Sequence, residues 1–150
     1  MTAAVLKSNP PIFVTLGIQG PPGPIGPQGG SGEQVFVRYA GEVVPALVVV
    51  WEDADGLVHP LSHTDTNHIY CALGLAISSA QVGESVRVQR MGAVDDESWS
   101  WTAGQRLYLA QDGRLTVTPP QDGAFFVVGT AVSPTRVLLN FYDPVLDAPL

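Results

Sequence analysis

The stretch DGAFFVVGTAVSPTRVLLNF, residues 122–141, indicates the fold most clearly. A turn signal at Asp122-Gly123 precedes two apolar runs rich in valine, residues 125–132 and 137–141. Dense runs of β-branched and aromatic residues are typical of central strands, and Asp-Gly favours a tight turn because both residues tolerate a positive φ. The stretch therefore predicts strands in the interior of a β-sheet.

The same kind of pattern continues outward over residues 34–142. Alternation with a period of two, as in half-buried strands, occurs in residues 35–39, 86–90 and 106–109. Further dense apolar runs and turn signals lie at residues 47–51 and 69–77 and at Asp55-Gly56, Val82-Gly83 and Asp112-Gly113. No stretch keeps a helical apolar period for about ten residues. We expect an all-β fold, a compact antiparallel β-barrel or sandwich, in a domain of residues 34–150.

Two parts of this region resemble each other. Residues 47–78 and 106–133 each contain a strand pattern, an Asp-Gly pair, a proline and a Gly-x-Ala-x-Ser motif. The Asp-Gly pairs are 57 residues apart and the Gly-x-Ala-x-Ser motifs 55 residues apart. The pattern predicts two related β-units packed around one core, although unrelated hairpins can also look alike.

A different pattern precedes the β-region, where glycine recurs at every third position. The six residues are Gly17, Gly20, Gly23, Gly26, Gly29 and Gly32. Collagen follows this rule because only glycine fits at the crowded axis of three chains. We expect a collagen-like stalk over residues 17–33 that spans on the order of 50 Å, in a homotrimer. A flexible Pro/Gly linker is the alternative.

A stalk of this length needs help from its neighbours. Few interchain hydrogen bonds offset the entropy of ordering so short a segment, so we expect the β-domain to trimerise and hold the three strands together. Residues 1–16 are apolar at Ile12, Phe13 and Val14, with Pro10 and Pro11 blocking a continuous helix. We interpret them as an attachment peptide, or else as a frayed terminus.

Charge and composition exclude several classes of protein. The formal net charge is −7, and Lys and Arg form no cluster that could neutralise phosphates, so we expect no nucleic-acid partner. No apolar run approaches the roughly 20 residues of a membrane span, and no secretory signal pattern is present. We expect no membrane association and synthesis in a cytoplasm. Cys71, the only cysteine, lies in the apolar run 69–77, and we expect a buried, inert thiol.

Few residues suggest chemistry. His59, His63 and His68 fall within ten residues, but across a polar loop instead of on a helix, so we do not expect a metal site. Asp53 and Asp55 resemble the opening of a calcium loop, yet the later ligands are absent and a hairpin turn explains them better. No nucleophile elbow, Cys-His pair or phosphate-binding loop is found. We expect no enzyme, no catalytic residues, no metal and no cofactor.

Two tryptophans, Trp99 and Trp101, follow the acidic residues 95–97. If residues 98–102 are extended, both side chains point to one face and pack together against an apolar surface. The structural interpretation is a solvated acidic loop followed by aromatic side chains that pack in the core or between subunits. Carboxylates beside aromatic side chains can also indicate a carbohydrate site, which makes this pair a candidate binding surface for glycans.

Several segments together resemble a family of small tailed-bacteriophage virion proteins. They are residues 17–23 (GIQGPPG), 98–105 (SWSWTAGQ), 107–109 (LYL) with 113–116 (GRLT), and 128–133 (VGTAVS). The resemblance implies a trimeric accessory protein on the virion surface, made in the host cytoplasm. It implies a capsid decoration or head-fibre protein bound to the major capsid protein, or else a small tail-fibre or baseplate protein bound to tail proteins. A host-glycan-binding module is the remaining alternative.

Overall fold

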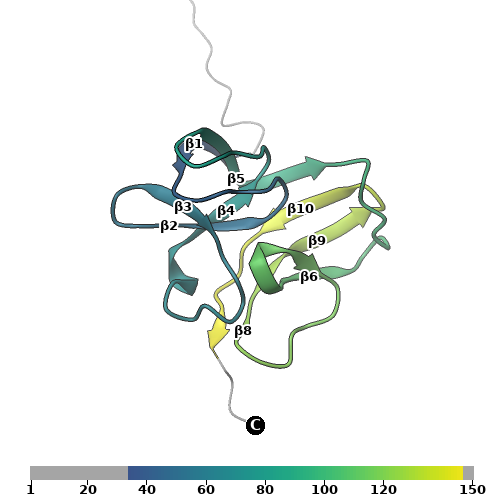
Figure 1. The fold of residues 1–150 in the computed structure, drawn as a ribbon. Coiled ribbons are helices and arrows are strands. Elements are labelled where there is room, and N and C mark those ends of the chain that lie inside the picture. Colours follow the sequence, from purple (N-terminus) through teal and green to yellow (C-terminus); the bar gives the residue numbers. More distant parts are fainter. Residues whose placement is uncertain (1–33, 147–150) are drawn as a thin grey trace, which may run out of the picture. The chain divides into compact units, whose positions relative to one another are not determined.

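The computed structural model describes residues 34–146, so the predicted stalk and attachment peptide lie outside the described residues. In that range the chain contains strands and two short 3-10 turns, η2 (Ile69–Cys71) and η3 (Gln111–Gly113), and no α-helix (Figure 1). The strands are β1 (Gln34–Ala40), β2 (Val49–Glu52), β3 (Leu57–Pro60), β4 (Ala72–Ala76), β5 (Ser85–Asp95), β6 (Arg106–Leu109), β7 (Leu115–Thr116), β8 (Ala124–Phe125), β9 (Val127–Ser133), β10 (Arg136–Asn140) and β11 (Val145–Leu146). The predicted all-β fold class is confirmed.

Five strands close a small barrel in the order β1-β3-β2-β4-β5, with β5 pairing back to β1. The predicted barrel is thus observed, but the expectation of antiparallel pairing is wrong for β1 and β3, which run parallel through Tyr39 and Ala40. The chain enters β2 before β3, so β3 returns in the direction of β1. The buried residues of the barrel interior are all valine or alanine, with the partly buried Leu73 packed against them, because few strands leave a narrow interior. The buried residues are Ala40, Val44, Val48, Val50, Val58, Ala76, Ala80, Val86 and Val88.

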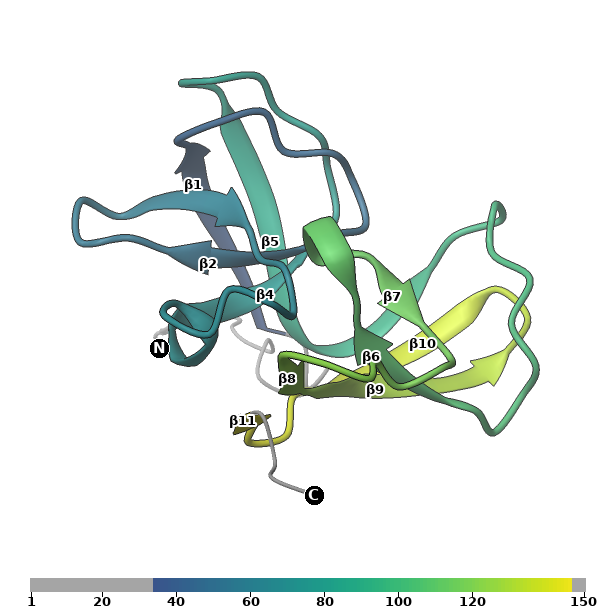
Figure 2. The ribbon, with the colours of Figure 1, turned by 60° about the horizontal axis from the view of Figure 1, so that its bottom comes forward.

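Strand β5 belongs to both halves of the β-domain. Its first part pairs with β1 and β4 in the barrel, and its last part, from Met91 to Asp95, pairs with β10. Beyond β10 the sheet continues through β9 and β6 to β7. Figure 2 shows β5 running from the barrel strands to this second group. Gly92, with a φ of 96°, lies where β5 changes partners.

The strand pairings repeat in the two halves. β2 lies between β3 and β4, and β6 lies in the same way between β7 and β9. Val50 pairs with Gly74, and Leu107 pairs with Gly129, and in each case the register shifts at the next residue of the central strand. The two pairs are offset by 57 and 55 residues, as are the sequence motifs. The register therefore agrees with the predicted pair of related β-units.

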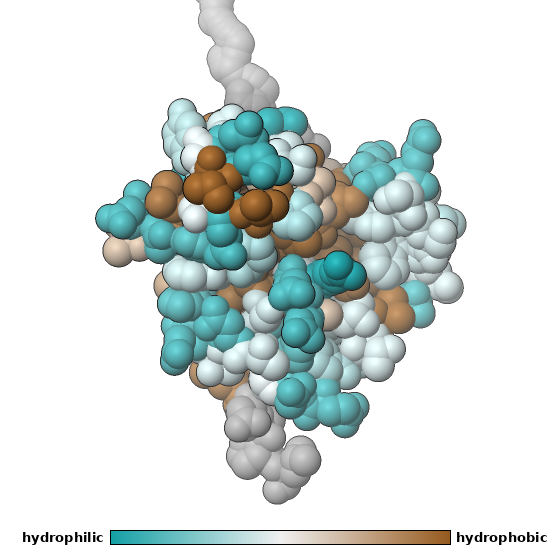
Figure 3. All heavy atoms as spheres, in the orientation of Figure 1, coloured by the Kyte–Doolittle hydropathy of each residue, from teal (hydrophilic) through white to brown (hydrophobic). Residues whose placement is uncertain are grey.

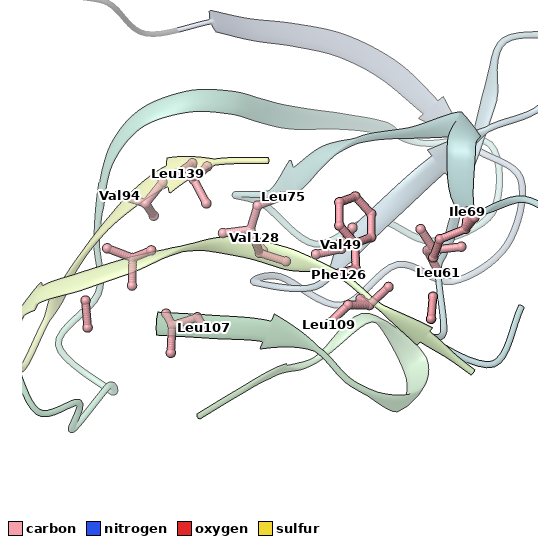
Figure 4. Packing of buried hydrophobic residues seen from close by; sticks show 13 residues of the cluster. Val49, Leu61, Ile69, Leu75, Val94, Leu107, Leu109, Phe126, Val128 and Leu139 are labelled. Atoms are coloured by element: carbon pink, nitrogen blue, oxygen red, sulfur yellow. The ribbon is translucent and has the colours of Figure 1, made fainter. Parts of the chain in front are cut away.

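The larger of the two hydrophobic clusters lies between the halves. Figure 4 shows Leu107 and Val128 of the second half near Val49 and Leu75 of the barrel strands. Val49 and Leu75 face this cluster, whereas their neighbours Val50 and Ala76 face the barrel interior. β2 and β4 are therefore buried on both faces, which explains why their sequences are apolar without alternation.

The apolar run 69–77 is not one strand. Its first residues form η2, in which Ile69 is buried while Tyr70 and Cys71 are exposed, and β4 begins only at Ala72. The prediction of a buried Cys71 thiol is therefore wrong. A 3-10 turn rotates successive side chains around its axis, so a single apolar residue, here Ile69, suffices to anchor it.

Candidate functional site

The most exposed apolar side chains on any barrel strand belong to β1. Val35, Val37 and Tyr39 alternate along the strand and are 44%, 59% and 57% exposed. Phe36 pairs with Val88 and Arg38 pairs with Val86, and the side chains of these two valines fill the barrel. Directly paired residues lie on the same face of a sheet, so the alternate residues of β1, Val35, Val37 and Tyr39, point outward. On the face seen in Figure 3, the larger apolar patches lie over the barrel half. The outward side of β1 is therefore an apolar surface on an otherwise acidic chain.

A second exposed apolar area lies on the outer face of β5 and β10. Met91 and Leu138, both 44% exposed, border a shallow hollow of about 450 Å³ together with Thr130 and Tyr142. The guanidinium of Arg106 lies 5.6 Å from the centre of the Tyr142 ring. The residues that line the hollow include no cluster of titratable groups, so the hollow suits contact with another protein surface better than catalysis.

The histidines of the barrel surround a tryptophan. The ring of Trp51 stacks on that of His68 at 3.7 Å between centroids, and on that of His59 at 4.6 Å. His59 lies 2.7 Å from Glu42 through Nδ1 and 2.7 Å from Asp53 through Nε2. A protonated His59 ring donates a hydrogen bond through each nitrogen, so this side chain connects β3 to two loops.

The carboxylates change the titration of His59. Burial alone lowers the pKa of His59, but the hydrogen bonds with Asp53 and Glu42 outweigh burial and raise the pKa above 6.5. The same hydrogen bond from His59 lowers the pKa of Asp53 below 3.8, and the backbone amides of Leu57 and Asp55 add to that effect. The charged pair is therefore favoured in the folded protein at mildly acidic pH.

The three histidines that the sequence analysis considered as metal ligands do not converge on one site. His63 lies 3.1 Å from Asp122, and His68 lies 2.9 Å from Asp65, so the three histidines contact different carboxylates. Among residues 34–146, no group of three or more His, Cys, Asp or Glu side chains is placed to hold a metal ion. The Asp53 carboxylate accepts backbone hydrogen bonds within the turn between β2 and β3, as expected for a hairpin turn.

Trp99 and Trp101 pack against each other, with ring centroids 5.9 Å apart, and both are half-buried against the larger core cluster. The two rings pack on each other and on an apolar surface, as predicted, although the segment around them forms no strand and is part of the loop between β5 and β6. The amide of Trp101 donates to the Pro134 carbonyl, in the turn between β9 and β10, and Asp96 likewise bonds to Thr135. The two tryptophan rings thus pack on the core from the loop between β5 and β6.

The remaining predicted residues, the six stalk glycines and Ile12, Phe13 and Val14, lie outside the described residues. The apolar surface of β1 was not identified from the sequence. Its alternation was recognised, but Phe36 and Ala40 on one face and Val35, Val37 and Tyr39 on the other are all apolar. Which face points outward depends on the pairing with β5, and the pattern within one strand does not contain that information.

Comparison with known proteins identifies the family. A model of the phage cement protein family matches residues 32–136, and the chain belongs to that family. A search of curated proteins gives no match. The protein is thus a structural component of a phage virion and associates with other virion proteins. Within residues 34–146, no helix is long and apolar enough to cross a membrane.

Proposed function

We propose that this cement protein is a homotrimeric capsid decoration or head-fibre protein, non-enzymatic, on the virion surface. Residues 1–16 attach it to the major capsid protein, and Ile12, Phe13 and Val14 supply the apolar contact. Residues 17–33 are a collagen-like spacer. The β-domain faces outward and holds the three copies together, so that the protein stiffens or extends the particle through its geometry.

The period of three in the glycines is the observation that supports the trimer. A single collagen-like chain has no partner for its backbone amides, since triple-helical hydrogen bonds form between chains. In a segment of this length, the few interchain hydrogen bonds do not offset the conformational entropy that is lost when the three chains become ordered. Three β-domains that associate raise the local concentration of the three collagen-like segments, so the triple helix forms as it would within one molecule.

The location on the virion distinguishes the proposal from its nearest alternative. A decoration or head-fibre protein is present in many copies distributed over the capsid, whereas a tail-fibre or baseplate protein is present in few copies at one vertex. Quantitative mass spectrometry of purified virions, scaled to the major capsid protein, measures the copy number. A few copies per particle would contradict the capsid location and favour the tail.

Attachment is tested by adding the purified protein to virions that lack it. The double variant Ile12→Asp/Phe13→Asp should lose binding, because two carboxylates cannot enter an apolar contact without a large desolvation cost. The control Thr2→Asp/Ser8→Asp carries the same two charges at polar positions and should bind like the unmodified protein. Equal binding of both variants would contradict the assignment of residues 12–14.

A further inference from the structure

The outward side of β1 has the features of an unfilled interface. Val35, Val37 and Tyr39 stand at two-residue spacing, roughly 7 Å apart along the strand, so they form one continuous apolar strip. Within the described residues, Gln34 to Arg38 pair with β5 alone, because β3 reaches only Tyr39 and Ala40. An apolar strand with an unpaired edge invites association with another chain unless something covers it.

The neighbouring charges allow a second copy to approach here. On β5, the residues opposite the strip are Gln89, Arg87 and Ser85, which pair with Val35, Val37 and Tyr39. These six residues include no carboxylate, in a chain with a net charge of −7. Copies that meet through this surface avoid bringing their acidic side chains face to face, which would repel at close range.

In the proposed homotrimer, the connection between the glycine repeat and β1 would bring three copies of this surface together. Gly32, the last glycine of the period, is followed by a single residue before β1 begins at Gln34. Two residues span at most about 7 Å, so three β1 strands that leave one triple helix start close to its axis. In that proposed arrangement, the first part of each strand, where the unpaired edge lies, would also be the part nearest to the axis.

We infer that the outward side of β1, formed by Val35, Val37 and Tyr39, is the surface through which three copies of this chain pack around their common axis. The inference rests on the homotrimer proposed above and adds the residues that hold it. The hollow bordered by Met91 and Leu138 is then left for other contacts.

The test compares two double variants of the full chain. Val37→Lys/Tyr39→Lys places six added positive charges around the axis, beside the three copies of Arg87. Tyr70→Lys/Val82→Lys makes the same two residue changes at positions that are 70% and 65% exposed outside β1. We expect the first variant to raise the trimer dissociation constant at least about tenfold, and the control to leave it within about twofold, in sedimentation equilibrium.

A cross-linking experiment tests the geometry without relying on a destabilised variant. In a Cys71→Ser background, Gln34→Cys should form disulfide-linked dimers on oxidation far more readily than Val82→Cys, because only position 34 lies near the axis. Circular dichroism of each variant verifies that the β-domain is folded.

The outcomes separate the two proposals. A trimer that tolerates Val37→Lys/Tyr39→Lys as well as it tolerates the control, or equal cross-linking at positions 34 and 82, would overturn the β1 interface and leave the homotrimer standing. A monomeric unmodified protein would overturn both.

Discussion

Gly74 and Gly129 occupy equivalent places in the two halves of the β-domain. A Cβ atom at Gly74 would lie 2.6 Å from the backbone oxygen of Gln89, and one at Gly129 would collide with the backbone oxygen of Leu138. In both halves the strand that carries the glycine therefore approaches its neighbour too closely for a side chain. The Gly-x-Ala-x-Ser motif was visible in the sequence, but the close approach that requires its glycine follows only from the packing.

Gly129→Ala should destabilise the β-domain by about 3 kcal/mol, because the added methyl group meets a backbone atom that cannot rotate away. Val132→Thr, on the same strand and 41% exposed, should change the free energy of unfolding by about 0.5 kcal/mol or less. Urea unfolding of both variants measures the difference. If Gly129→Ala were as stable as Val132→Thr, the proposed close approach of β9 and β10 would be wrong.

His59 should make stability depend on pH. Because the pKa of His59 is raised, its contribution to the stability of the folded protein is complete below pH 6.5, the ordinary value for histidine. That contribution disappears as the pH rises through the raised pKa. Asp53 has a lowered pKa, so its contribution is present above 3.8 and disappears as the pH falls through the lowered value. The pair of His59 and Asp53 therefore stabilises the folded protein most between pH 3.8 and pH 6.5, the ordinary pKa values of the two side chains.

The variant His59→Gln should consequently lose more stability at about pH 5.5 than at about pH 8.5. The lost stacking on Trp51 is common to both conditions, so the difference between them isolates the charge. Thermal unfolding at the two pH values, with Val82→Thr as a control, provides the measurement. A loss that is the same at both values, or larger at the higher one, would contradict the charged pair.

At the scale of single elements, period-two patterns located the strands but not their limits. Alternation over residues 86–90 predicted β5, yet the strand continues to Asp95, where pairing with β10 maintains it without an alternating pattern. Conversely, the alternation of Trp99 and Trp101 would fit a strand, but the structure has none over residues 98–102, and the hydrogen bond from Trp101 to Pro134 holds them in a loop. Both differences arise from contacts with residues about 35 to 50 positions away, which a local pattern cannot indicate.

The proposed collagen-like stalk, residues 17–33, should respond sharply to a single substitution. In the proposed triple helix, Gly23→Ala would place three added methyl groups, one from each chain, at the crowded axis. We expect the variant to lose protease resistance in residues 17–33, while the β-domains remain associated. Limited proteolysis followed by mass spectrometry measures this, with Gln28→Ala, which leaves the glycine period intact, as the control.

Unchanged protease resistance in Gly23→Ala would contradict the triple helix and favour the flexible linker. Loss of the β-domain association in the same variant would instead contradict the proposal that the β-domain holds the trimer. The two results are distinguished by measuring mass and cleavage on the same sample.

For the whole molecule, the sequence predicted the all-β class and the duplicated pattern but could not choose between barrel and sandwich. That choice depends on the pairing of β1 with β5 and on the parallel contact of β1 with β3, which join residues far apart in the chain. The same pairings decide that Val35, Val37 and Tyr39 face outward. The candidate interface is therefore a property of the closed barrel, and no single strand contains it.

The molar mass of the full chain in solution tests the central proposal, the homotrimer, most directly. Multi-angle light scattering on protein eluting from a size-exclusion column at micromolar concentration should give three times 15.9 kDa. A mass of 15.9 kDa that does not change as the concentration is raised would contradict it.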